Sequence, residues 1–142
     1  MLITLVVFIS AVNMKSCNKN KEKSAKTDIK PILIDENMAI APKYDNTIKF
    51  TARVKGDILT ATIEYHGCEN DEFDLVFNKM WLKSLPPKAN LFLKKTEGTC
   101  DKKGNYTKTY KFDLKNLRNS SSKEVMVKIM NYTEYFKYEY KQ

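Results

Sequence analysis

The chain of 142 residues has little of what metal-binding, fibrous and nucleic-acid-reading proteins use most: four glycines, three cysteines and one histidine. Four glycines exclude a collagen-like or glycine-rich disordered chain. Only two of the 25 basic residues, Arg53 and Arg118, are arginines. Because arginine makes most bidentate contacts to bases and phosphates, the net charge of +8 predicts a solvated, lysine-rich surface and no nucleic-acid partner.

Hydrophobic runs of membrane-spanning length, about 20 residues, are missing as well. Residues 2–12 (LITLVVFISAV) are uncharged and fit the apolar core of a signal peptide. The Ser16-Cys17 pair that comes after them resembles the cleavage site of Bacteroidota lipoproteins, in which the cysteine is acylated. We therefore expect a lipoprotein signal peptide at 1–16, a lipid on Cys17 as the membrane contact, and an outer-membrane location in the cell envelope. Simple secretion is the alternative.

A polar segment comes after the expected lipid site. Residues 17–30 carry five lysines and almost no apolar side chain that could pack in a core, so they predict a flexible tether. The remaining residues, 31–142, are enough for one folded domain and show no internal repeat.

Alternating apolar residues dominate that domain. Ile48, Phe50, Ala52 and Val54 fall on one face of a strand, and a second alternating run comes after Gly56-Asp57, which predicts a hairpin with a two-residue turn. Further runs of this kind lead us to expect an all-β fold, an immunoglobulin-like, antiparallel two-sheet sandwich of about seven or eight short strands. A barrel is the competing architecture. Residues 115–122 predict a loop with a single turn under Leu117.

The cysteines form a pair if Cys17 carries lipid. Cys68 and Cys100 lie at the ends of predicted strands, and an oxidising compartment favours a disulfide between them. His66 lies two residues before Cys68 and leaves two alternatives open. A zinc site would need further ligands, and a catalytic cysteine would need a group that orients the histidine.

Acidic residues cluster around this cysteine pair. Glu69, Asp71 and Asp74 come after Cys68, and a disulfide would bring Asp101 close to them. Several carboxylates in one place are weak candidates for Ca²⁺ ligands or for the paired acids of a hydrolase. The spacing matches no EF-hand, so a solvated loop is the simpler interpretation. We expect no cofactor and no resident metal.

Aromatic residues crowd the C-terminus. They could form a platform for sugar rings, or alternate residues could belong to the core while the others cover the sheet. The residues in question are Tyr132, Tyr135, Phe136, Tyr138 and Tyr140.

Three segments together resemble the C-terminal β-sandwich domain of NigD-like lipoproteins of Bacteroidota. They are residues 65–75 (YHGCENDEFDL), the PPxxNLFL motif at 86–93 with Cys100 after it, and FDLxxL at 112–117. The resemblance covers about residues 45–142 and implies a sandwich, a Cys68–Cys100 bridge and an envelope location. It implies no biochemical activity. Asp71 stands where that group often has a histidine.

The function expected from these observations is a lipid-anchored envelope protein with a non-enzymatic domain that binds a protein or glycan partner. An immunity or inhibitor protein against a toxin is one alternative. The other is a hydrolase that uses the clustered carboxylates of Glu69, Asp71, Asp74 and Asp101.

The mature protein tests the export interpretation directly. Intact mass spectrometry of protein from native membranes should give an acylated chain that begins at Cys17. Reduction should add the two hydrogens of one disulfide. A mature chain that begins elsewhere and has free thiols at Cys68 and Cys100 would contradict both expectations.

Overall fold

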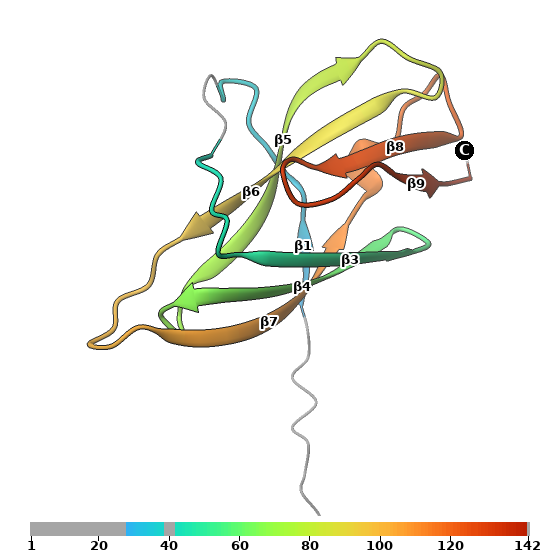
Figure 1. Ribbon diagram of the computed structural model, residues 1–142. Coiled ribbons are helices and arrows are strands. Elements are labelled where there is room, and N and C mark those ends of the chain that lie inside the picture. The colour runs from blue at the N-terminus through green and yellow to red at the C-terminus, as the bar shows by residue number, and fades with distance from the viewer. Residues whose placement is uncertain (1–27, 39–41, 142) are drawn as a thin grey trace, which may run out of the picture.

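The computed structural model describes residues 28–38 and 42–141 (Figure 1). The expected signal peptide, Cys17 and most of the expected tether lie outside the described residues. Within the described part, all regular structure is strand apart from one short 3₁₀ turn. No helix in these ranges is long and apolar enough to cross a membrane.

One sheet has four strands in the order β1 (Ile29–Pro31), β7 (Gly104–Asp113), β4 (Ile58–Gly67) and β3 (Lys49–Lys55). The predicted hairpin is confirmed, since β3 and β4 pair in antiparallel fashion around Gly56-Asp57. Gly56 has a φ of 58°, a left-handed conformation that glycine adopts without steric cost.

The other sheet has five strands in the order β2 (Leu33–Ile34), β5 (Glu72–Leu82), β6 (Lys88–Thr96), β8 (Glu124–Ile129) and β9 (Phe136–Glu139). The expected all-β sandwich is confirmed, and it has nine described strands. The expectation of purely antiparallel sheets is wrong, because β1–β7, β2–β5 and β6–β8 are parallel pairs. Alternation of apolar residues reports which face a strand buries and carries no information on strand direction.

The core lies between the two sheets. Leu59 and Ile63 of β4 face it from one side, and Leu75 and Leu91 face it from the other, all fully buried. Each such side chain contributes about 1.5–3 kcal/mol of transfer free energy. The predicted turn is also confirmed: η1 (Lys115–Leu117) places Leu117 in the core.

The domain begins earlier than the sequence predicts. Residues 29 and 30, expected in the tether, belong to β1 and pair with β7. The chain then crosses between the sheets at Ile32, which is buried, and continues as β2 beside β5. The segment is held by its pairing with distant strands and by the burial of Ile32. Ala52, predicted on the same strand face as Phe50, is exposed, whereas Phe50 is buried.

A disulfide joins Cys68, just after β4, to Cys100, in the loop between β6 and β7. It therefore links a strand of one sheet to the connection that leaves the other. The two residues are 32 apart in the chain, and closure of such a loop contributes about 3–4 kcal/mol in the chain-entropy account.

Candidate functional site

The acidic segment between β4 and β5 lies beside this disulfide, and Asp71 is its buried member, with 2% of its surface exposed. One carboxylate oxygen accepts the backbone N–H of Cys68 at 3.1 Å, and the other accepts that of Gly98 at 2.7 Å. The Lys95 ammonium lies 3.0 Å from Oδ2 of Asp71. Both oxygens of this carboxylate are therefore occupied by donors from the protein.

Two glycines make room for this arrangement. A Cβ on Gly67 would lie 2.1 Å from Oδ2 of Asp71, and one on Gly98 would lie 2.0 Å from Oδ1 of Asn70. Both distances are far below van der Waals contact. The glycines therefore allow the loop after β4 and the loop after β6 to approach each other around Asp71.

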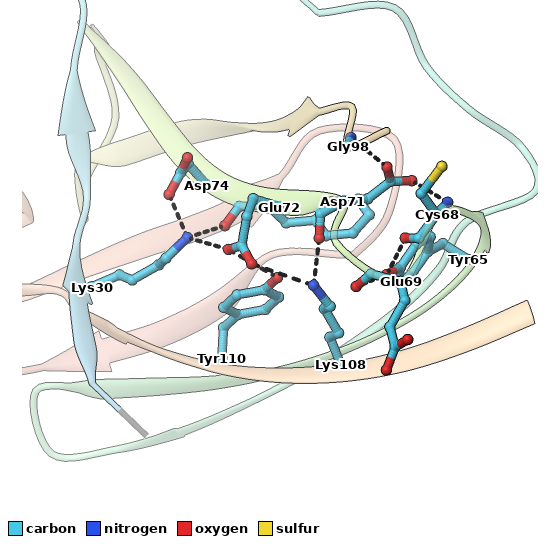
Figure 2. A network of polar contacts seen from close by, with 11 residues as sticks. Lys30, Tyr65, Cys68, Glu69, Asp71, Glu72, Asp74, Gly98, Lys108 and Tyr110 are labelled. Atoms are coloured by element: carbon cyan, nitrogen blue, oxygen red, sulfur yellow. Dashed lines mark hydrogen bonds and ion pairs between the residues drawn. The ribbon is translucent and has the colours of Figure 1, made fainter. Parts of the chain in front are cut away.

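A second group of polar contacts spans the two sheets where β1 and β7 face β5 (Figure 2). The Lys30 ammonium donates to Asp74 at 2.9 Å, to the carbonyl of Phe73 at 3.0 Å and to Glu72 at 3.2 Å. From β7, Lys108 donates to the Asp71 carbonyl at 2.6 Å and lies 3.3 Å from Glu72. Lysines of one sheet thus neutralise carboxylates of the other.

The pKa directions agree with these contacts. Burial alone raises the pKa of Asp71, but the donors from Gly98, Lys95 and Cys68 outweigh it and hold this pKa below its ordinary value. For Glu72, burial again raises the pKa, and Lys30 and Lys108 lower it further than burial raises it. Both groups are therefore stabilised in the charged form, which is the opposite of what a general acid needs.

The carboxylates proposed as Ca²⁺ ligands or hydrolytic acids do not form a common site. Asp71 points to backbone donors, Asp74 pairs with Lys30, and Glu69 and Asp101 are exposed. In the described ranges, no three His, Cys, Asp or Glu side chains come together as a metal site would require. In the described residues, the four carboxylates therefore do not converge on a point where they could hold one ion or one substrate.

The two alternatives for His66 also find no support in the geometry. Its ring nitrogen Nδ1 lies 2.9 Å from the side-chain oxygen of Asn105 on the exposed face of the first sheet. Cys68 is bonded to Cys100 and has no free thiol with which to attack a substrate or hold a metal.

The C-terminal aromatic residues do not form one platform. Tyr138 is fully buried, and its hydroxyl donates to Asp57 at 2.6 Å, beside Arg118. Tyr140 packs against Tyr138 with ring centroids 5.0 Å apart. Tyr138 therefore belongs to the core, and Tyr140 is half-buried and packs against it. Tyr132 alone among the five lines an open cleft at the other end of β6.

This cleft, of about 470 Å³, lies between the segment before β3 and the end of β6. Tyr44, with 48% of its surface exposed, and Tyr132 line it with ring centroids 5.2 Å apart. Ile48 and Leu93 add apolar surface, and charged and polar groups complete the lining: Lys43, Asp45, Asn46, Lys94, Lys95 and Glu97. This volume falls in the range of small-molecule sites.

The sequence analysis did not identify the lysines that pair with the acidic segment, nor Tyr44 as a residue of the cleft. Lys30 falls in the expected tether, and Lys95 and Lys108 have the pattern of surface charges. Lys108 carried one signal, because its even position in β7 places it on the inward face with Phe112. Tyr44 carried none, since nothing local shows that it meets Tyr132 across 88 residues.

Replacement of the buried carboxylate should be costly and pH-dependent. Asp71→Asn should lower the free energy of unfolding by about 2–4 kcal/mol at pH 7, because it leaves Lys95 unpaired and cannot accept both backbone donors as well. The folded pKa is depressed, so this stabilisation is complete above the unfolded pKa of about 3.9 and disappears as the pH falls through the folded value. Urea unfolding should show the difference narrowing below about pH 4.

Asp101→Asn is the matched control, since Asp101 is exposed in the same region. Its effect should stay within about 0.5 kcal/mol. An Asp71→Asn protein as stable as this control would contradict the assigned role of Asp71.

No protein-family model matches the chain, and no curated protein matches it. Among solved structures, the fold is similar to the crystal structure of a protein of unknown function, DUF1344, from Bacteroides vulgatus, with a TM-score of 0.52 and 17% sequence identity. The similarity covers 80% of this chain and 57% of that one, so this chain spans little more than half the length of its neighbour. At this identity the similarity shows a common fold alone.

Proposed function

We propose that this chain is a lipid-anchored envelope protein whose folded domain binds a ligand outside the cytoplasm and does not transform it. The export interpretation rests on residues 1–17. The binding interpretation rests on one contrast in the folded domain. The acidic residues that a hydrolase would use are exposed singly or held by lysines and backbone donors, whereas the aromatic cleft at Tyr44 is open.

The cleft favours a glycan as the ligand. A sugar ring has an apolar C–H face and a rim of hydroxyl groups. The exposed ring of Tyr44 can stack on the apolar face, while Lys94, Glu97 and Asn46 lie within the same lining to bond the hydroxyls. The volume of about 470 Å³ suits a short oligosaccharide better than a protein surface, which would need a wide contact area.

The immunity or inhibitor alternative remains a prediction, since no contact in the described residues favours a toxin partner over a glycan. The hydrolase alternative would need two carboxylates that face one cleft with separated pKa values. Of the four candidates, Asp71 has a pKa that its donors hold below the ordinary value, and Asp74 is paired with Lys30.

Calorimetric titration of the full chain with envelope glycans, peptidoglycan fragments among them, tests this proposal. Tyr44→Ala should weaken binding about tenfold, which corresponds to about 1.4 kcal/mol, because it removes the stacking surface. Tyr135→Ala is the matched control: Tyr135 bonds Asn90 at 2.8 Å and does not line the cleft.

The product mixture after long incubation should be unchanged. Release of shortened sugars by the wild-type chain would contradict a binding-only role. Equal binding by the Tyr44 and Tyr135 variants would remove the cleft as the site.

A further inference from the structure

The end of β5, the turn after it and the first residue of β6, residues 79–88, expose several large apolar side chains that do not face the core. We call these ten residues the hairpin tip. Leu85 is 98% exposed, Met80 is 68% exposed and Leu82 is 44% exposed. Figure 1 shows this turn at the top of the view, away from the sheet of β3, β4 and β7. A soluble domain seldom gathers large apolar side chains at one protruding point unless that point meets another surface.

The hairpin tip is held in place by hydrogen bonds and by packing. The Ser84 hydroxyl donates to the Pro86 carbonyl at 2.7 Å, and the backbone N–H of Met126 donates to the Pro87 carbonyl at 2.9 Å. Trp81 packs edge-on against Phe77 with ring centroids 5.1 Å apart. The exposed apolar residues are therefore presented in a fixed arrangement, so little conformational entropy would be lost when they contact a partner.

The charged residues of the hairpin tip itself are all basic. Lys79, Lys83 and Lys88 lie in residues 79–88, which contain no aspartate or glutamate. Glu36, in the loop after β2, pairs with Lys79 and offsets one of these charges. Exposed apolar side chains with lysines beside them are complementary to a surface that has negatively charged groups outside and an apolar interior.

We propose that the hairpin tip contacts an anionic phospholipid bilayer, with Leu85 and Met80 entering the acyl region and the lysines meeting lipid phosphates. An apolar side chain flanked by lysines on a rigid turn satisfies both requirements of interfacial binding. A membrane is within reach in the cell if the proposed envelope location holds, but the contact itself depends only on the described residues.

Trp81 makes the proposal measurable, because it is the only tryptophan of the chain and lies in the hairpin tip. The full chain is mixed with vesicles whose phospholipids carry brominated acyl chains, which quench tryptophan at short range. Quenching should be stronger with phosphatidylglycerol present than with phosphatidylcholine alone. Because only Trp81 reports, a lipid or apolar segment elsewhere in the chain cannot imitate this signal.

Two substitutions separate the apolar contribution to membrane binding from the electrostatic one. Leu85→Asp should weaken the partition that causes quenching by about tenfold or more, since a side chain that would be buried in lipid becomes charged. Lys83→Gln should weaken it about fivefold in phosphatidylglycerol vesicles and little in neutral ones. Ile29→Asp, at an exposed apolar residue on β1, is the control and should leave quenching unchanged. Unchanged urea midpoints confirm that each variant is folded.

Three results would overturn the proposal. One is an unquenched Trp81 while sedimentation shows the protein on the vesicles. Another is equal quenching of wild type and Leu85→Asp. The third is a vesicle-free dimer that Leu85→Asp dissociates, which would assign the hairpin tip to a second copy of the chain. None of these depends on acylation at Cys17, so they are distinguishable from failure of the lipoprotein proposal.

Discussion

Charge compensation of the acidic segment is the constraint on which this fold depends. A carboxylate as buried as Asp71 is tolerated only if donors surround it, because an uncompensated buried charge costs several kcal/mol. Here the donors come from the loop after β6 and from Lys95, so the compensated charge fixes that loop against the start of β5. The disulfide between Cys68 and Cys100 closes the same corner of the sandwich.

The same requirement explains how the first strand joins the domain. Lys30 of β1 forms ion pairs with Asp74 and Glu72 of the opposite sheet, while β1 itself pairs with β7. After β1 the chain crosses to the other sheet at Ile32. These outer ion pairs are partly exposed and each contributes about 0–1 kcal/mol, so the buried Asp71 is the stronger anchor. Asp71 and Asp74, which resemble part of a site in the sequence, thus belong to the scaffold. The surfaces proposed to bind lie elsewhere, at the Tyr44 cleft and the hairpin tip.

Much of the fold could be predicted from the sequence, because alternation directly encodes which face a strand buries. The strand through Phe50 and Val54, the Gly56-Asp57 turn and the position of Leu117 all came from local pattern. Strand direction and the β1–β2 crossing did not, since they are decided by pairing between distant segments. The site was less predictable still: Lys30 and Tyr44 acquire their roles through partners more than 40 residues away, and no local pattern records a non-local contact.

The central claim is that Asp71 is a compensated structural charge and neither a catalytic acid nor a metal ligand. Side-chain carboxyl titration by NMR, with and without added Ca²⁺, measures this directly. The account predicts that the Asp71 carboxyl titrates below the ordinary range for aspartate and that Ca²⁺ leaves its signal unmoved. A pKa at or above the ordinary value, or a carboxyl signal that shifts as Ca²⁺ is added, would contradict it.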